Sequence, residues 1–242
     1  MCFLLWTGQA GAVPTLQLYI EDAEYFDSTD IAGVNVTESW FTTNNPFELV
    51  VAGALSPSSI DVIEDVVLWI AVQADDIGDP ENSGGSITVR DSAGDLVLPY
   101  YYTGTAPSYE MLYGTPETLS PHGVYPAYYF GYELPDLDVL AGGDPIYDYN
   151  ADYDPDNPGD APATGDIQYY SIEYSEYFWL HMDLSGTAYD LDGNKIKTYE
   201  RVAPYSHDAD APTSPIPEPA TMLLLGTGLI ALASAGRRFT GN

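Results

Sequence analysis

The chain is poor in basic residues. Six Lys and Arg stand against 37 Asp and Glu, which gives a formal net charge of −31. This charge excludes nucleic acid and anionic lipid surfaces as partners, because both would repel the protein. The hydrophobic content of 45% and the 21 tyrosines exclude a disordered acidic chain, which would be poor in aromatic residues.

Cysteine and histidine are also scarce. The only cysteine is Cys2, so no disulfide can form within the chain. The three histidines, His122, His181 and His207, are too far apart in sequence for the short ligand spacing of a zinc site. No serine lies in a Gly-x-Ser-x-Gly elbow. We therefore expect a protein that is not an enzyme, in which the histidines pack or form turn hydrogen bonds.

A long uncharged run lies near the C-terminus. Residues 219–236 form a run of eighteen residues without a charge, which as a helix would be about 27 Å long. About 20 residues usually cross a bilayer, so the run predicts a single C-terminal transmembrane helix. Arg237 and Arg238 follow it. Cationic loops stay on the cytoplasmic side, so the preceding chain is expected outside the cytoplasm.

Pro217, Glu218 and Pro219 stand at the outer edge of this run, and the basic pair Arg237 and Arg238 stands at its end. In this order the tail resembles the PEP-CTERM sorting signal of bacterial envelope proteins. The resemblance implies that an exosortase, a membrane-embedded protease or transpeptidase, recognises the Pro-Glu-Pro tripeptide and removes the tail. The alternative is a plain anchor helix, which keeps its tail.

The N-terminus also has the features of an exported protein. An apolar stretch from Met1 to Trp6 leads to Ala10-Gly11-Ala12, a small-x-small triplet typical of a signal-peptidase site. The stretch is short and has no basic residues before it, which indicates a truncated signal peptide over residues 1–12. We expect the mature chain to begin near Val13.

Between these ends the pattern is that of strands. Residues 15–21 alternate apolar and polar side chains, and residues 60–74 are rich in β-branched residues, although Ser58 and Ser59 could cap a helix there. Gly- and Asp-containing turns predict hairpins at 92–95 and 192–194. Further strands are expected at 36–43, 47–51, 86–90, 96–98, 123–134, 167–174, 177–184 and 195–201. The pattern predicts an all-β domain over 13–202, most simply a two-sheet antiparallel β-sandwich of jelly-roll or Ig-like type. A Pro-rich linker is expected over 203–216 and the sorting tail over 217–242.

Several interior segments carry a second resemblance. They are 14–21, Glu38-Ser39-Trp40 with Asn45-Pro46-Phe47, 121–126 and 203–209. In this order they resemble the choice-of-anchor N domain. The resemblance implies export together with a sorting tail, and it brings neither an activity nor catalytic residues.

An acidic stretch over 144–166 carries seven aspartates and no basic residue. Calcium takes six to eight oxygen ligands, and Asp152, Asp154, Asp156 and Asn157 have the alternation of a loop that wraps an ion. The stretch is not an EF-hand, because its Gly and Glu are not at the required positions. A calcium site and a solvated acidic loop both remain open.

Paired tyrosines suggest a sugar-binding surface, because exposed aromatic faces can stack on pyranose rings. Alternate residues of a strand face opposite sides of the sheet, so one tyrosine of each pair should point into the core. Tyr101, Tyr128 and Tyr170 are the candidate binding residues, and packing is the alternative.

Together these observations predict an exported protein of the cell surface or extracellular matrix with a non-catalytic structural or adhesive role. Signal peptidase and exosortase would be its partners during export, exopolysaccharide is a candidate partner afterwards, and the tail would be its only contact with the membrane. A calcium-assisted glycan-binding module is the alternative, and a secreted hydrolase comes third.

Overall fold

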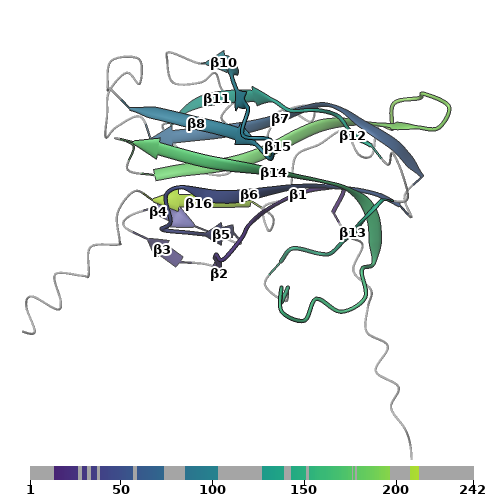
Figure 1. Cartoon of the computed structure of the whole chain (residues 1–242), viewed down its shortest axis with the longest axis horizontal. Coiled ribbons are helices and arrows are strands. Elements are labelled where there is room, and N and C mark those ends of the chain that lie inside the picture. The colour runs from purple at the N-terminus through teal and green to yellow at the C-terminus, as the bar shows by residue number, and fades with distance from the viewer. Residues whose placement is uncertain are drawn as a thin grey trace, which may run out of the picture.

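The protein is described here by a computed structural model (Figure 1), and every regular element among its described residues is a strand. The described residues are 14–26, 29–31, 34–36, 39–56, 59–73, 85–102, 127–138, 143–150, 153–175, 177, 179–196 and 208–212. Within these ranges there is no helix. The all-β prediction is therefore confirmed for this part of the chain. The expected signal peptide and sorting tail lie outside it.

The first sheet has six strands in the order β1–β6–β14–β8–β9, and β13 also pairs with β14. All its pairs are antiparallel. The strands are β1 (Leu16–Ile20), β6 (Phe47–Ser56), β8 (Ser86–Asp91), β9 (Leu96–Val97), β13 (Asp144–Ile146) and β14 (Ala163–Ser175).

The second sheet has eight strands in the order β10–β11–β7–β15–β16–β5–β2, and β12 also pairs with β7. The strands are β2 (Glu24–Phe26), β5 (Ser39–Phe41), β7 (Ile60–Gln73), β10 (Pro99–Tyr102), β11 (Ala127–Glu133), β12 (Leu137–Asp138), β15 (Trp179–Asp190) and β16 (Asp208–Pro212). The strands β3 (Thr29–Ile31) and β4 (Val34–Val36) form a separate pair. The antiparallel prediction needs one correction, because β16 runs parallel to β5.

The strand prediction for residues 60–74 is confirmed over residues 60–73 by β7, and Ala74 lies outside the described residues. This strand pairs with β11 on one side and β15 on the other, which suits its β-branched side chains. Both predicted hairpin turns are also present, and the same hydrogen-bond pattern, centred on an Asp side chain, stabilises each of them. Asp91 Oδ1 accepts hydrogen bonds from the backbone N–H groups of Ala93 and Asp95, and Asp190 Oδ1 accepts from those of Asp192 and Asn194.

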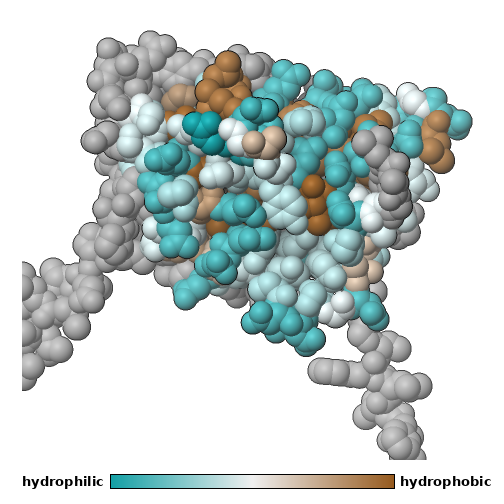
Figure 2. Space-filling model, in the orientation of Figure 1, coloured by the Kyte–Doolittle hydropathy of each residue, from teal (hydrophilic) through white to brown (hydrophobic). Residues whose placement is uncertain are grey.

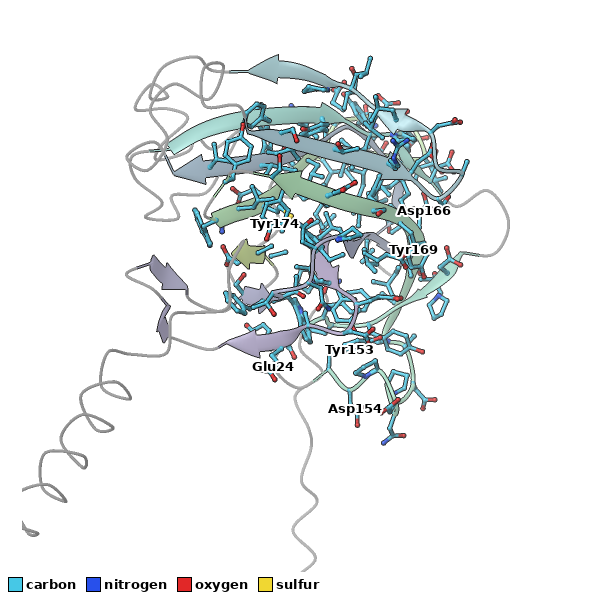
Figure 3. The ribbon with its side chains drawn as sticks, turned by 60° about the vertical axis from the view of Figure 1, so that its left-hand side comes forward. Glu24, Tyr153, Asp154, Asp166, Tyr169 and Tyr174 are labelled. Atoms are coloured by element: carbon cyan, nitrogen blue, oxygen red, sulfur yellow. The ribbon has the colours of Figure 1, made fainter. Side chains whose placement is uncertain are left out.

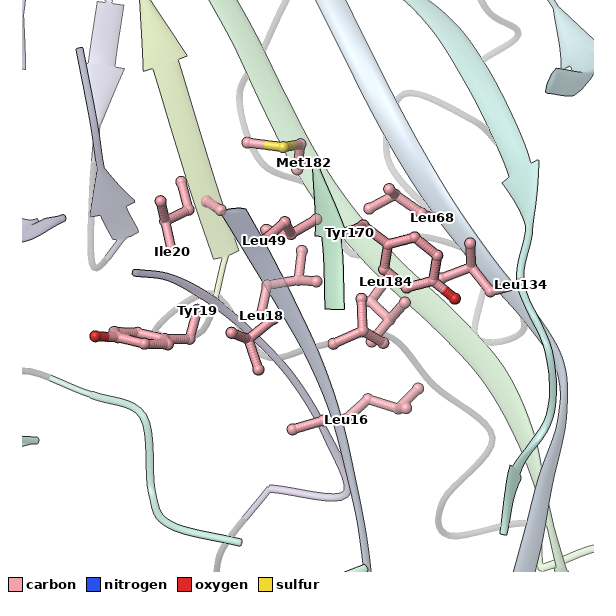
Figure 4. Close-up of a cluster of buried hydrophobic side chains, with 14 of the residues drawn as sticks. Leu16, Leu18, Tyr19, Ile20, Leu49, Leu68, Leu134, Tyr170, Met182 and Leu184 are labelled. Atoms are coloured by element: carbon pink, nitrogen blue, oxygen red, sulfur yellow. The ribbon is translucent and has the colours of Figure 1, made fainter. Parts of the chain in front are cut away.

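One hydrophobic core receives side chains from both sheets (Figure 4). Leu18 and Leu49 come from the six-stranded sheet, whereas Leu68, Met182 and Leu184 come from the eight-stranded sheet, and all five are nearly or fully buried. Burying one such side chain contributes about 1.5–3 kcal/mol relative to leaving it exposed. Two sheets that share a core in this way need no disulfide.

The folded part of the chain extends beyond the expected boundary at residue 202. Residues 208–212, which fall in the expected Pro-rich linker, form β16 between β15 and β5. Ala209 and Ala211 are fully buried, and Asp210 between them is almost so. Ala209 and Ala211 belong to the hydrophobic core. Asp210 points to the opposite face of the sheet, where its charge is balanced by a histidine described below.

Candidate functional site

A cluster of buried charged side chains holds the C-terminal strand in place. His181 on β15 lies between two carboxylates. Its Nδ1 is 2.9 Å from Asp210 Oδ1 on β16, and its Nε2 is 3.6 Å from Asp183 Oδ2 on its own strand. His181, Asp183 and Asp210 are only 6%, 1% and 2% exposed. Trp179 stacks on the imidazole with ring centroids 5.5 Å apart.

The electrostatics of this cluster favour a protonated histidine. Burial alone would lower the pKa of His181, but the charges and hydrogen bonds of Asp210 and Asp183 outweigh it and raise that pKa well above 6.5. An imidazolium here has a carboxylate on each side, so it compensates one of the two negative charges that Asp183 and Asp210 carry when ionised. The sequence prediction of a packing or hydrogen-bonding role for His181 missed this pairing. The His-x-Asp pattern at residues 181–183 could have indicated the pairing of His181 with Asp183, because residues i and i+2 of a strand lie on the same face.

The cluster is built to hold strands together. A general base must come within about 3.2 Å of the substrate atom that carries the proton, whereas His181 is closed off from solvent. Its chemistry is therefore that of an ion pair between β15 and β16.

A second group of side chains covers the outer side of β1, opposite the core. Tyr19 lies there against Trp40, Tyr149 and Tyr153, with ring centroids 4.7, 5.3 and 5.3 Å away. Gln17 is fully buried beside them. We call Tyr19, Tyr25, Trp40, Tyr147, Tyr149 and Tyr153 the aromatic cluster.

Hydrogen bonds to backbone fix the acidic stretch onto this cluster. Gln17 Nε2 donates to Tyr147 O at 3.0 Å, and Gln17 Oε1 accepts from Tyr149 N at 2.9 Å. Trp40 Nε1 donates to Tyr149 O at 3.0 Å. The tyrosines of the acidic stretch thus pack on the domain, whereas Asp154, next to Tyr153, is exposed to solvent. Figure 3 shows Tyr153 and Asp154 side by side in this loop.

Three of the four predicted calcium ligands lie among the described residues. Asp154, Asp156 and Asn157 are exposed, and Asp152 lies outside the described residues. Asp154 Oδ1 accepts a hydrogen bond from Asp156 N at 3.0 Å, and Asn157 N donates to Asp154 O at 3.1 Å. In the described ranges no three acidic, His or Cys side chains are grouped as metal ligands. Calcium binding stays a prediction.

The predicted sugar-binding tyrosines are placed differently from one another. Tyr170 is 2% exposed, and its hydroxyl donates to Gln168 Oε1 at 2.7 Å, so it faces the interior. Its neighbour Tyr169 is 39% exposed and takes the outward position. Tyr101 and Tyr128 belong to β10 and β11, but their side chains are outside the described set. The sequence could have shown which tyrosine of Tyr169 and Tyr170 is buried. Tyr170 is two residues before the buried Ile172, so both side chains lie on the same face of the strand.

Residues 215–238 match the model of the PEP-CTERM protein-sorting motif. The chain carries a PEP-CTERM sorting motif. Pro217, Glu218, Pro219, Arg237 and Arg238 all fall inside the match. The motif marks the protein as exported to the cell envelope or surface and processed by an exosortase. The resemblance to the choice-of-anchor N domain stays a prediction.

The PEP-CTERM motif begins almost where the described fold ends. Pro212 is the last residue of β16, so only two residues separate this strand from the matched segment. The predicted transmembrane helix lies outside the described residues. Among those described, no helix is long and apolar enough to cross a membrane.

Comparison with complete proteins adds little to the PEP-CTERM match. No curated protein matches the chain. One solved structure that does match is described as "AvmM Catalyzes Macrocyclization in Alchivemycin A Biosynthesis". It covers 80% of this chain and 97% of its own, at 11% sequence identity and a TM-score of 0.35. A likeness at this level carries no conclusion about activity.

Proposed function

We propose that this protein is an exported β-sandwich that exosortase releases from its membrane tail, after which it acts at the cell surface or in the extracellular matrix. Its role there is structural or adhesive, without catalysis. The observation that carries the proposal is the PEP-CTERM motif at residues 215–238. Tail removal would leave the β-rich domain outside the cell, and its high negative charge would keep it soluble there.

Two structural features support a non-catalytic role. The buried charged cluster places His181 where a substrate cannot reach it. The core from both sheets and the anchored acidic stretch make the domain self-supporting without a disulfide. Such a domain suits an extracellular protein that must persist.

The position of β16 supports a particular geometry of processing. Residues 213–216 connect Pro212 to Pro217, and the five Cα-to-Cα steps between these two prolines span at most about 18 Å. The folded domain would therefore lie close to the membrane surface while the tripeptide is recognised. Exosortase would act on a chain whose last strand is already part of a sheet.

The test is replacement of Glu218 in the producing cell. Glu218→Ala should leave membrane insertion intact, because the apolar run is unchanged, but should block tail removal. The protein would then stay in the membrane fraction with the mass of its tail. Glu24→Ala, which changes an exposed glutamate of β2 far from the tail in sequence, is the matched control and should be processed normally. Normal release of the Glu218→Ala protein would overturn the proposal.

A further inference from the structure

The outer face of the six-stranded sheet carries a hollow of about 590 Å³. This volume lies within the usual range for small-molecule sites, about 300–1,000 Å³. Its lining includes Glu48, Arg90, Asp91, Tyr169 and Ser171. We call it the Tyr169 hollow. Figure 3 shows Tyr169 near Asp166, which belongs to the same strand. Figure 2 shows that the face of the molecule seen in Figure 1 is mainly hydrophilic.

Strand register places the floor residues of the hollow in one row. Ser171 on β14 is opposite Glu48 on β6 and opposite Arg90 on β8. All three side chains are exposed. Tyr169 is two residues before Ser171 and so shares its face. The hollow therefore combines an aromatic ring, a carboxylate, a guanidinium and a hydroxyl on three neighbouring strands.

One wall of the hollow is the turn between β8 and β9, and it is held in shape before any ligand arrives. Asp91 Oδ1 accepts from Ala93 N and Asp95 N, each at 2.9 Å. Arg90 Nη1 donates to Gly94 O at 3.1 Å, which orients its guanidinium along the turn. Groups that are already oriented lose less entropy on binding than mobile ones.

Tyr169 is suited to both stacking and hydrogen bonding. Burial, followed by the charges of Glu21, Asp144 and Glu48, raises the pKa of its phenol. The hydroxyl therefore stays protonated at neutral pH and can donate a hydrogen bond, while part of the ring remains open to solvent.

The charges around the hollow exclude an acidic ligand. The lining holds one guanidinium, that of Arg90, and two carboxylates, those of Glu48 and Asp91, and the whole chain carries a formal net charge of −31. A carboxylated or sulfated polymer would be repelled. A lipid or an apolar peptide would leave these polar groups without hydrogen bonds. Neutral sugars fit, because their hydroxyls both donate and accept and their ring faces are apolar.

We propose that the Tyr169 hollow binds a neutral hexopyranose polysaccharide. Tyr169 stacks on the apolar face of one sugar ring, Glu48 accepts hydrogen bonds from sugar hydroxyls, and Arg90 and Ser171 donate to sugar oxygens. This inference rests on the export proposed above, because polysaccharide is met outside the cell. It gives the adhesive role a ligand class and a location.

The test is affinity electrophoresis in native gels that contain barley β-glucan, galactomannan or alginate. The full chain is kept in a polyoxyethylene detergent, which carries no sugar. At least one of the two neutral polymers should retard the protein, and the acidic alginate should not. Tyr169→Ala should weaken the retardation at least tenfold, whereas Tyr169→Phe, which keeps the ring, should retain most of it.

Tyr189→Ala is the matched control, because Tyr189 is a half-buried tyrosine of the other sheet, on β15. It should bind as the wild type does. The inference is overturned if neither neutral polymer retards the wild type, if alginate retards it as strongly, or if Tyr169→Ala binds unchanged. None of these results would alter tail processing, which is measured separately by the mass of the Glu218→Ala protein.

Discussion

Replacing Asp210 with Asn should lower the free energy of unfolding and flatten its dependence on pH. Asn has nearly the same size, and its side-chain oxygen can still accept a hydrogen bond from His181 Nδ1. The change removes the carboxylate that, against the effect of burial, does most to raise the pKa of His181. Asp183 remains as the other partner, 3.6 Å from Nε2.

The size of the loss follows from this geometry. A hydrogen bond to a charged group contributes about 1.5–3 kcal/mol, and breaking a buried ion pair outright costs about 3–5 kcal/mol. Because the introduced amide would keep an acceptor and Asp183 would keep the charge pairing, we expect the lower range for Asp210→Asn, about 2 kcal/mol at pH 6.

The pH dependence has a definite sign. The pKa of His181 is raised in the folded state, so its stabilisation is complete below its ordinary value of 6.5 and is lost as the pH rises through the folded value. Between these two values the folded protein holds one more proton than the unfolded chain. The free energy of unfolding then falls by up to about 1.4 kcal/mol per pH unit. Asp210→Asn lowers the folded-state pKa of His181, so the pH range between the unfolded and folded pKa values becomes narrower. The difference in free energy of unfolding between the wild type and Asp210→Asn should therefore shrink as the pH rises.

Urea unfolding followed by tryptophan fluorescence between pH 6 and pH 9 measures both effects, and Trp179 reports directly because it stacks on His181. Asp154→Asn makes the same chemical change at an exposed position and should shift stability by no more than about 0.5 kcal/mol. A loss below that size for Asp210→Asn at pH 6, or a constant difference across the pH range, would refute this reasoning.

Three further predictions concern the fold and the acidic stretch. Far-UV circular dichroism of residues 13–212 should show mainly β-structure, and a helix content near one-third, the globular average, would contradict the fold. Millimolar calcium should raise the melting temperature more than sodium chloride at matched ionic strength, since a ligand at 100 times its Kd adds about 2.7 kcal/mol to the free energy of unfolding. Replacing Asp152, Asp154 and Asp156 together with Asn should abolish the difference between the two salts. Equal effects of the two salts on the wild type would show that the stretch is a solvated loop. Gly165→Ala should lower the free energy of unfolding by about 1–3 kcal/mol or more, because a Cβ there would overlap the backbone of β6. Gly159→Ala has open space around its Cβ but a φ of +73°, and it should lower that free energy by about 1 kcal/mol. Urea unfolding that reverses this order would show that β14 and β6 are less close than described.

The residue pattern of a short segment was enough to predict two kinds of element: tight hairpin turns and strands rich in β-branched residues. Residues 60–74 are rich in β-branched side chains, and β7 covers residues 60–73 of this segment. Asp91 and Asp190 begin the two turns, and Gly94 and Gly193 in them adopt positive φ, so the positions of the turns could be predicted from their Asp and Gly residues. Such signals depend only on neighbours in sequence.

Features set by distant contacts could not be predicted in the same way. The prolines after residue 203 indicated a linker, whereas β16 depends on a gap between β15 and β5 and on His181 as a partner for Asp210. The acidic stretch was interpreted by its aspartates. Its tyrosines matter as much, because they pack on Tyr19 and Trp40 of distant strands.

The measurement that most directly tests the proposed function is the intact mass of the protein recovered outside the cell and in the membrane fraction. It should be made in producer cells with and without their exosortase. With exosortase, the extracellular protein should end near Pro217 and lack the residues up to Asn242. Without it, the protein should stay in the membrane with the full tail. Release of the same processed form from both cell types would contradict the account.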